Sequence, residues 1–382
     1  MKTKSFNQWK ELEMKDLFDI YQPKTISKDD LKHDGKYLVY GANGIIGKYD
    51  KYNHEKSEVL VTCRGATCGS VNFSQPYSWI TGNSMVITPK KDFEKNIDKY
   101  FLYYYLKNSN LNKTISGTAQ PQITREPLKK LKFSFPPFTI QQKIVSILEK
   151  TEKLKEMRQE ADNLTEEYLN AVFLEMFGDP IVNPKGWKVD KVKNHIDFLT
   201  GYPFKSKEYT DDNTEVRLCG GLIIMPYGIE WNKANYWKRN LTKGLEKYWL
   251  DVRDIVIAMD RPWISSGFKI CQIKEEDVPS LLVQRTARIR VKDVNQNFLF
   301  WLFKHKSFEI HAKPTETTVP HISSKDIQEF EIILPPLELQ NDFSNIVKSI
   351  EFVKTYQKQS KTNIDNLFNN LIQKSFRGEL TC

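Results

Sequence analysis

The order of apolar and polar positions along this chain occurs twice. One copy contains LKFSFPP at residues 131–137 and the other contains FEIILPP at residues 330–336, so Pro136 and Pro335 stand 199 residues apart (335 − 136). The same offset holds without a gap to Phe177 and Phe376, although few residues are identical. A period of this length is too large for a solenoid. It predicts two similar modules, each ending in a strand, a pair of prolines and a long helix.

The strand and the start of the helix are clearest in the first copy. Residues 131–135 alternate between apolar and polar side chains, which predicts a half-buried strand. Pro136 and Pro137 end this strand, because neither can donate a hydrogen bond to a sheet. Thr139 stands three residues before Gln142, the spacing of a capping box, and this predicts the start of the helix.

A narrow apolar stripe at steps of three and four follows each pair of prolines, which is typical of a coiled-coil seam. The first stripe consists of Ile144, Ile147, Thr151, Leu154, Met157, Ala161, Leu164, Tyr168 and Val172. The second consists of Phe343, Ile346, Ile350, Val353, Tyr356, Ser360, Ile364, Leu367 and Leu371. Each helix would hold about 37–40 residues and measure ~55–60 Å. We expect the two helices to pack against each other as an antiparallel pair; the alternative is two separate helices, each docked on its own domain.

Each module also opens with a similar segment, WKELEMKDLFDI at residues 9–20 and WKVDKVKNHIDF at residues 187–198. Between these markers the two sequences show no obvious similarity. Both nevertheless predict strands, a short aromatic helix, an exposed loop and the final strand, in that order. The predicted strands are residues 59–62, 84–88, 255–258, 268–273 and 287–291, and the predicted short helices are residues 100–106 and 298–303.

The predicted fold class is α/β (α+β), with two pseudo-symmetric mixed α/β domains separated by two long antiparallel coiled-coil helices. The expected domain boundaries are 1–138 for the first mixed α/β domain, 139–178 for the central helix, 179–337 for the second mixed α/β domain and 338–382 for the C-terminal helix. With 382 residues, the chain is long enough for each half to have its own core.

Composition narrows the class of protein. The net charge is +9, which indicates an anionic partner, although heavy use of lysine alone would produce the same excess. The five cysteines are odd in number and scattered, so we expect free thiols in a reducing cytoplasm. The polar N-terminus excludes a signal peptide, and no apolar run approaches the ~20 residues that a spanning helix needs. A cytoplasmic location is therefore expected.

Catalytic motifs are missing from the sequence. GANGIIGK at residues 41–48 resembles a phosphate-binding loop, but five residues instead of four separate its outer glycines and Tyr49 follows the lysine. A glycine-rich turn between strands is the better interpretation. No Gly-x-Gly-x-x-Gly motif opens a helix, and Cys63 and Cys68 have no second pair to complete a zinc site. We therefore expect a protein that is not an enzyme and that binds no cofactor or metal itself.

Two arginines follow predicted strands and are candidates for binding DNA. Arg64 follows the strand at residues 59–62, and Arg261 follows the strand at residues 255–258, with Trp263 close behind it. Arginine reads guanine bidentately in the major groove, whereas lysine and hydroxyl groups mostly hold phosphates. The alternative is a surface arginine paired with a nearby carboxylate, and Asp260 is beside Arg261.

Two polar loops precede the closing strands at equivalent positions. SGTAQPQ contributes Ser116 and Gln122, and ETTVPH contributes Thr317 and His321. Their hydroxyl and amide groups are candidates for contacts with bases or phosphates, or else they cap ordinary turns. Lys48 in the glycine-rich segment completes the set of predicted DNA-binding residues.

These motifs resemble the specificity (S) subunits of type I restriction-modification systems, the HsdS family. The resemblance covers essentially the whole chain and rests on the loops SGTAQPQI and ETTVPHI, the units LKFSFPP and FEIILPP, and the helix starts IQQKI and LQNDF. GANGIIG also resembles a turn that is common in such recognition domains. Members of the family usually have Glu-Gln at the helix start, whereas Ile140-Gln141 and Leu339-Gln340 keep only the glutamine.

The resemblance implies two target-recognition domains, each reading half of a bipartite, asymmetric site in double-stranded DNA, with the long helices as the spacer. It also implies as partners two modification (methyltransferase) subunits and two restriction (endonuclease and translocase) subunits. S-adenosylmethionine, ATP and magnesium are then expected on the partner subunits. The alternatives are a stand-alone DNA methyltransferase or nuclease with a diverged active site, and a coiled-coil adaptor that binds nucleic acid without sequence preference.

Overall fold

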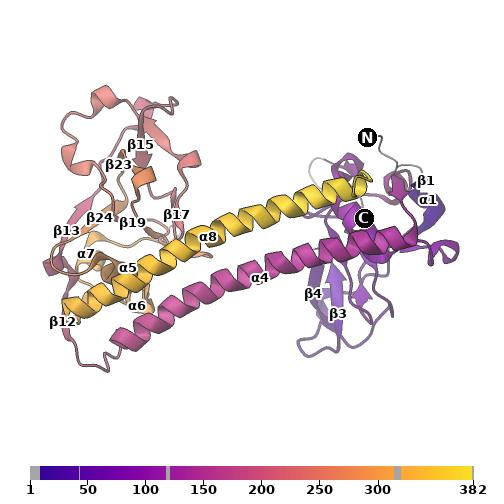
Figure 1. Ribbon diagram of the computed structural model, residues 1–382, viewed down its shortest axis with the longest axis horizontal. Coiled ribbons are helices and arrows are strands. Elements are labelled where there is room, and N and C mark those ends of the chain that lie inside the picture. Colours follow the sequence, from indigo (N-terminus) through magenta and orange to yellow (C-terminus); the bar gives the residue numbers. More distant parts are fainter. Residues whose placement is uncertain (1–8, 43, 118–120, 314–319, 381–382) are drawn as a thin grey trace. The chain divides into compact units, whose positions relative to one another are not determined.

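A computed structural model describes residues 9–42, 44–117, 121–313 and 320–380. The chain forms two compact units, one of Met1–Glu160 with Gln357–Cys382 and one of Ala161–Tyr356. Two 40-residue helices, α4 (Phe138–Phe177) and α8 (Leu337–Phe376), each contribute a segment to both units (Figure 1). Among the described residues, no helix is apolar over enough of its length to cross a membrane.

The first unit is built on a four-stranded antiparallel sheet in the order β2-β8-β5-β6. A smaller sheet in the order β4-β3-β7 accompanies it, and β3 and β7 are parallel. The strands are β2 (Phe18–Tyr21), β3 (Tyr37–Gly41), β4 (Gly44–Tyr49), β5 (Val59–Thr62), β6 (Val71–Phe73), β7 (Trp79–Ile80) and β8 (Ser84–Pro89). Strand β5 is buried on both faces: Val59 and Val61 face the core that includes helix α2 (Lys99–Asn108), while Leu60 packs with Ile80 of the smaller sheet.

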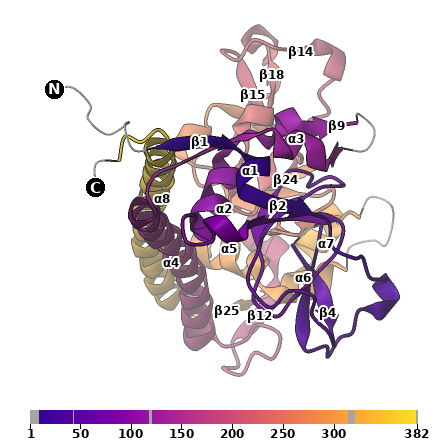
Figure 2. The same cartoon turned by 90° about the vertical axis from the view of Figure 1, so that its right-hand side faces the viewer.

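The second unit repeats the topology of the main sheet, although the two bodies share no obvious sequence similarity, and its smaller sheet has one strand more. Its main sheet has the order β13-β24-β19-β22 and its smaller sheet the order β14-β18-β15-β23, in which β15 and β23 are parallel. Figure 2 shows β14, β18 and β15 of the smaller sheet next to one another. The strands are β13 (Ile196–Thr200), β14 (Tyr209–Thr210), β15 (Val216–Cys219), β18 (Asn235–Trp237), β19 (Ile255–Ala258), β22 (Ile270–Gln272), β23 (Ser280–Leu282) and β24 (Thr286–Val291). Helix α5 (Gln296–Lys304) stands where α2 does, and α6 (Lys306–Ala312) follows it. The predicted mixed α/β fold with two long helices is confirmed.

The duplicated markers pair with each other in each unit. Strand β1 (Lys10–Glu13) from the first opening segment pairs with β11 (Lys132–Phe135), the strand that precedes the prolines. Strand β12 (Lys188–Lys191) pairs in the same register with β25 (Glu331–Leu334). The opening and the end of each module are therefore held together by one antiparallel ladder.

Helix α4 is anchored by a glutamine side chain in place of the predicted capping box. The helix begins at Phe138, so Thr139 is already helical and the predicted box with Gln142 is wrong. Gln141 is fully buried, and its Nε2 donates to the carbonyls of Asn96 (2.7 Å) and Pro136 (2.8 Å). Its Oε1 accepts from the backbone N–H of Asp98 (2.9 Å), the residue whose carboxylate caps α2. One carboxamide therefore connects the long helix, the proline break and the aromatic helix.

The second unit repeats this junction. Gln340 is buried, its Nε2 donates to the carbonyl of Pro335 (2.8 Å), and its Oε1 accepts from the backbone N–H of Asn295 (2.8 Å). Asn295 caps α5 as Asp98 caps α2. The glutamine that the sequence keeps at both helix starts thus has a structural role within its own module.

In each unit the segments of α4 and α8 run antiparallel and share a core with the module body. In the first unit Leu148 lies in one core with Ile372, and Lys155 pairs with Asp365 at 2.8 Å. In the second unit Phe173 and Phe177 meet the Phe343 ring at 5.5 Å in both cases. The helices therefore pack against each other, as in the expected antiparallel pair, and also against the module bodies, as in the alternative of docked helices.

The predicted seam is only partly buried. Several of its members have between 43% and 58% of their surface exposed, namely Leu154, Met157, Leu164, Tyr168, Val353, Tyr356 and Leu367. The buried members of the seam, such as Ile144 and Phe343, are those where a helix meets a module body as well as the other helix. A continuous coiled-coil seam was therefore the wrong prediction for these residues, because packing on the bodies decides which side of each helix is buried.

Three charged side chains form ion pairs between the opening segment and the closing segment of the second unit. Glu329, just before β25, accepts from Lys191 Nζ at 2.6 Å and from Lys193 Nζ at 2.5 Å. These hydrogen bonds and charges lower the pKa of the Glu329 carboxyl to about 2. Because the folded-state pKa lies below that of the unfolded chain, this contribution to stability is present above the unfolded pKa and is lost as the pH falls towards 2.

Replacing Gln141 with alanine should destabilise the protein by about 1–3 kcal/mol, because the Asp98 N–H and two carbonyls would be left buried without their partner. Urea unfolding measures the loss. Gln142→Ala, at the exposed neighbouring position, is the matched control and should change stability by less than about 0.5 kcal/mol. Equal effects of the two substitutions would contradict the anchoring role.

Removing one lysine from the ion pairs of Glu329 should raise the pKa of Glu329 towards its ordinary value of 4.5. Carbonyl-resolved NMR titration of Lys191→Met and Lys193→Met measures this shift. Lys325→Met, on the short helix α7 (Ser324–Gln328) that precedes Glu329, should leave the Glu329 titration unchanged. A Glu329 carboxyl that still titrates near pH 2 after both lysines are removed would show that the ion pairs are not the cause.

Candidate nucleic-acid interface

In the first unit, the segment that follows β5 pairs with the end of the polar loop. The Ile123 N–H donates to the carbonyl of Cys63 at 3.0 Å, and Arg64 and Gln122 face each other as a β-bridge. Ser116 lies opposite Gln122 in the short ladder of β9 (Ile115–Ser116) and β10 (Gln122–Ile123). Arg64, Ser116 and Gln122 are all exposed. The structure therefore brings three of the predicted residues into one surface cluster.

The second unit has the same construction after β19. The Ile322 N–H donates to the carbonyl of Met259 at 2.9 Å, and Asp260 and His321 form the corresponding bridge. The Arg261 N–H donates to the carbonyl of Pro320 at 2.7 Å, and the Arg261 side chain is exposed. Thr317 lies outside the described residues.

Two of the predicted residues lie apart from these clusters. Trp263 belongs to a hairpin of β20 (Trp263–Ile264) and β21 (Gly267–Phe268), where its ring stacks on Phe268 at 4.7 Å and packs against the main core. Packing is therefore its main observed role. Lys48 is exposed on β4 opposite Leu38 of β3, in the smaller sheet. Residues 44–49 form strand β4 and Gly41 ends strand β3, so most of the glycine-rich segment is strand and not the expected turn, and its described residues form no phosphate-binding loop leading into a helix.

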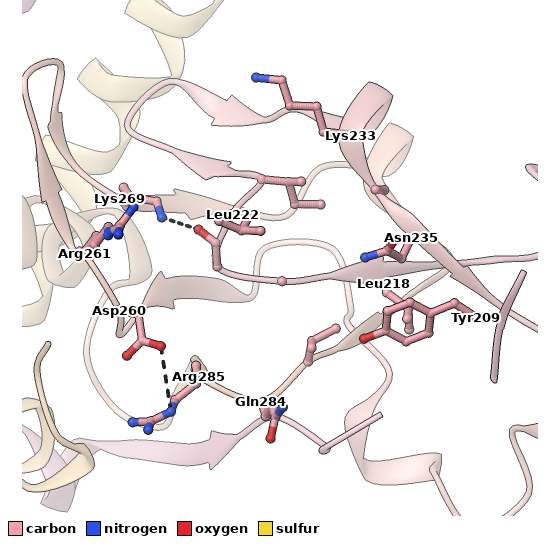
Figure 3. A pocket seen from close by; sticks show the side chains of 15 residues that line it. Tyr209, Leu218, Leu222, Lys233, Asn235, Asp260, Arg261, Lys269, Gln284 and Arg285 are labelled. Atoms are coloured by element: carbon pink, nitrogen blue, oxygen red, sulfur yellow. Dashed lines mark hydrogen bonds and ion pairs between the residues drawn. The ribbon is translucent and has the colours of Figure 1, made fainter. Parts of the chain in front are cut away.

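A cavity of about 480 Å³ lies beside Asp260 and Arg261 in the second unit (Figure 3). Lys269 lines it with only 5% of its surface exposed, and its Nζ donates to the carbonyl of Gly221. Burial lowers the pKa of the Lys269 ammonium, with a further decrease from Arg261 and an opposing increase from Asp260. The Asp260 carboxylate lies 3.8 Å from Arg285 Nε, so it pairs with Arg285 and not with its neighbour Arg261.

Sequence reasoning missed Lys269 and Arg285. Lys269 interrupts the apolar segment 268–273 and looks like the solvent-facing residue of an alternating strand. Arg285 lies in the turn before β24, and a polar residue between two strands is too common to single out. Only the β19–β22 and β23–β24 connections bring the two side chains to one place.

Equivalent positions in the two units carry different chemistry. In the first unit, the Thr62 N–H donates to the carbonyl of Ser70 and the Cys63 N–H donates to the carbonyl of Asn83. In the second unit, the Ala258 N–H donates to the carbonyl of Lys269 and the Met259 N–H donates to the carbonyl of Arg285. The resulting equivalent pairs are Arg64 and Asp260, Ser70 and Lys269, and Asn83 and Arg285. The backbone is thus the same at this strand end, while the charges on it are not.

Comparison with known proteins shows which family contains this duplicated arrangement of strands, prolines and long helices. The family model described as type I restriction modification DNA specificity domain matches residues 7–165 and again residues 184–366. The chain belongs to this family. It is a DNA specificity subunit of a type I restriction-modification system, and such subunits recognise DNA without catalysing the reaction. Both the family and the non-catalytic role were predicted from the sequence, and both are confirmed.

Individual relatives match over nearly the whole chain. The type I restriction enzyme MjaVIII specificity subunit of Methanocaldococcus jannaschii is 23% identical over 94% of this chain and 89% of its own length. The crystal structure of the type I restriction-modification S subunit from M. genitalium has a TM-score of 0.61 at 16% identity and covers 98% of both chains. A chain from a study of complex assembly and conformational transition in the type I system has a TM-score of 0.58 at 15% identity. These two structures share the fold.

Among the described residues, no group of three or more histidine, cysteine, aspartate or glutamate side chains is placed to hold a metal ion. Burial raises the pKa of the thiols of Cys219 and Cys271, so neither is an activated nucleophile. The exposed clusters beside β5 and β19 instead offer hydrogen-bond donors and acceptors. Such groups bind a partner without reacting with it.

Proposed function

We propose that each unit reads one half of a bipartite, asymmetric site in double-stranded DNA, through the surface beside the end of its central strand. Residues 1–138 and 179–337 would be the recognition domains, and the helices at 139–178 and 338–382 would set the spacing between half-sites. The observation that carries the proposal is that equivalent backbone positions of the two units hold opposite charges, Arg64 in the first and Asp260 in the second. Unlike groups in like places would read unlike bases.

The chemistry of the two clusters suits different base edges. Arginine donates bidentately to guanine and glutamine bonds adenine through its amide, so Arg64 and Gln122 are suited to a purine edge. An aspartate accepts from the amino group of cytosine, and this suits Asp260. Ser116, Lys48 and His321 would hold phosphates or sugars, as hydroxyl groups and cations commonly do. The net charge of +9 supplies the salt-dependent attraction to the DNA backbone.

We also infer that the chain assembles in the cytoplasm with two modification subunits and two restriction subunits. The likeness to a chain from a study of type I complex assembly supports this. Large apolar side chains are exposed on both long helices, for example Met157 (56%) and Phe352 (64%). Exposed apolar side chains on a helix are suited to partner helices. S-adenosylmethionine, ATP and magnesium chemistry would then belong to the partners.

Substituting one cluster should alter one half-site only. Asp260→Asn should relax or change the base preference at a position in the half-site read by the second unit, with an expected discrimination loss of about 1–3 kcal/mol at that position. Arg64→Gln should do the same in the other half-site. Methylome sequencing of cells that express each variant of the complex reports both half-sites at once. Asp211→Asn, an exposed aspartate that neither lines the cavity beside Asp260 nor takes part in the Asp260–His321 bridge, is the control and should leave the motif unchanged.

The assignment of one half-site to each unit would be wrong if either cluster variant altered both halves of the motif. The role of the strand end would be wrong if both variants methylated the wild-type motif with unchanged selectivity. Loss of all methylation would be examined by measuring whether the variant still assembles with the modification subunits.

Inserting four residues, about one helical turn, in the middle of α4 or α8 should lengthen the unspecified gap between half-sites and leave both half-sites unchanged. The physical reason is that a helix rises by 1.5 Å per residue and would act as the ruler between two unchanged recognition surfaces. Selection from random duplexes by the assembled complex measures the gap. A changed half-site sequence with an unchanged gap would contradict the spacer role.

A further inference from the structure

The cavity beside β19 has the composition of an anion site. Its lining holds the basic side chains of Lys233, Arg261, Lys269 and Arg285 and one acidic side chain, Asp260; the Lys233 ammonium is already paired with Glu230 at 2.5 Å. Figure 3 shows Lys269 and Arg261 together on one side, with Asp260 turned towards Arg285. The one carboxylate is therefore already shared with an arginine, and the lining has an excess of positive charge.

Lys269 is the group that most needs a partner. Only 5% of its surface is exposed, and among the described residues its ammonium donates to one backbone carbonyl, that of Gly221. In the part of the chain that the structure describes, no carboxylate lies within ion-pair distance of its Nζ, because Asp260 faces Arg285. A buried cation is costly unless an anion and further acceptors satisfy it. An anionic ligand in the cavity would supply both.

Two of the arginines that line the cavity have a strained, left-handed backbone conformation. Arg261 has φ of +45° and Arg285 has φ of +63°, the left-handed region that only glycine adopts without cost. The residue of the first unit that stands in the place of Arg261 is Gly65, with φ of +89°. The second unit therefore keeps an arginine where the same turn is relaxed by glycine in the first unit.

We propose that this cavity is a phosphate-binding pocket of the second unit, with Lys269 at its centre and Arg261 and Arg285 at its rim, and that it takes a phosphate of the DNA backbone. The inference rests on the proposed function, since it names the part of the DNA that this unit holds. A recessed ammonium cannot reach a base edge inside a duplex, whereas a backbone phosphate projects from the helix surface. Lysine binds phosphate as a point charge, and arginine binds it through a planar fork.

Among the described residues, the first unit lacks the two charges on which this pocket depends. The positions of Lys269 and Arg285 are occupied in the first unit by Ser70 and Asn83, which carry no charge. The second unit would therefore hold the DNA backbone more strongly and with a steeper dependence on salt than the first.

The test is the salt dependence of DNA binding by the full-length chain assembled with its modification subunits. Lys269→Met and Arg285→Gln should each reduce the slope of log K against log salt by about one, and should weaken binding to the cognate duplex and to a scrambled duplex by the same factor. Lys269→Met keeps most of the buried stem, and Arg285→Gln changes a side chain that is largely exposed. If the first variant fails to fold, the second still tests the pocket.

Leu222→Ala is the matched control, because Leu222 lines the same cavity, is 83% exposed and carries no charge. It should leave the salt slope unchanged. A change in the ratio of cognate to scrambled binding with an unchanged slope in the lysine and arginine variants would overturn the proposal in favour of base reading. Wild-type slopes in both variants would overturn it altogether.

A second measurement separates backbone phosphate from a small phosphate ligand. The complex without DNA is titrated with AMP and with inorganic phosphate at constant ionic strength. Weak binding of both, lost in Lys269→Met, supports a pocket for a phosphate that DNA delivers. Tight, saturable AMP binding together with an unchanged DNA salt slope would overturn the assignment to DNA. A wild-type complex that selects no bipartite duplex would contradict the proposed function itself, whereas selective binding with unaffected variants contradicts only the pocket.

Discussion

Each module depends on a buried carboxamide at the point where its chain turns from sheet to long helix. A pair of prolines removes two backbone donors there, so the first turn of the helix and the preceding carbonyls need another partner. Gln141 and Gln340 provide it, and each also receives the backbone N–H of the residue that caps the short aromatic helix. The side chain thereby fixes the helix direction relative to the sheet. Without it, the backbone groups that it bonds would be left buried without a partner, at a cost of about 1–3 kcal/mol.

The same constraint explains why the two bodies differ in sequence but not in topology. In each unit the closing strand, the aromatic helix and the central strand must stay connected. The backbone hydrogen bonds donated by residues 62–63 and by residues 258–259 go to equivalent positions in the two units. Side chains that point away from these connections are not held by them. Arg64 and Asp260 are such side chains, since backbone bridges fix their positions while their charged groups remain free to differ.

Much of this frame could be predicted from the sequence because it rests on local rules. The alternation at residues 131–135 and the continuous apolar run at residues 255–258 were enough to place β11 and β19 within a residue. The helix start was missed by one or two residues, because Gln141 takes its partners from residues 96 and 98, which no local spacing reveals. The exposed seam residues Tyr168 and Tyr356 were missed for a related reason, since burial there depends on where each module body covers a helix.

The candidate site shows where such reasoning ends. Arg64, Ser116 and Gln122 were found because a polar residue after a predicted strand and a polar loop before the next one are local signals, and the fold brings them together. Lys269 and Arg285 were not, because each is unremarkable until two separate connections place both beside Asp260. Among the described residues, the buried Lys269 ammonium donates to one backbone carbonyl, and Lys269 lies near Arg261, whose place in the other unit is taken by glycine. The proposed phosphate would supply the anion that such a buried cation needs. The asymmetry of the DNA site would then extend beyond the bases to the strength with which each half is held.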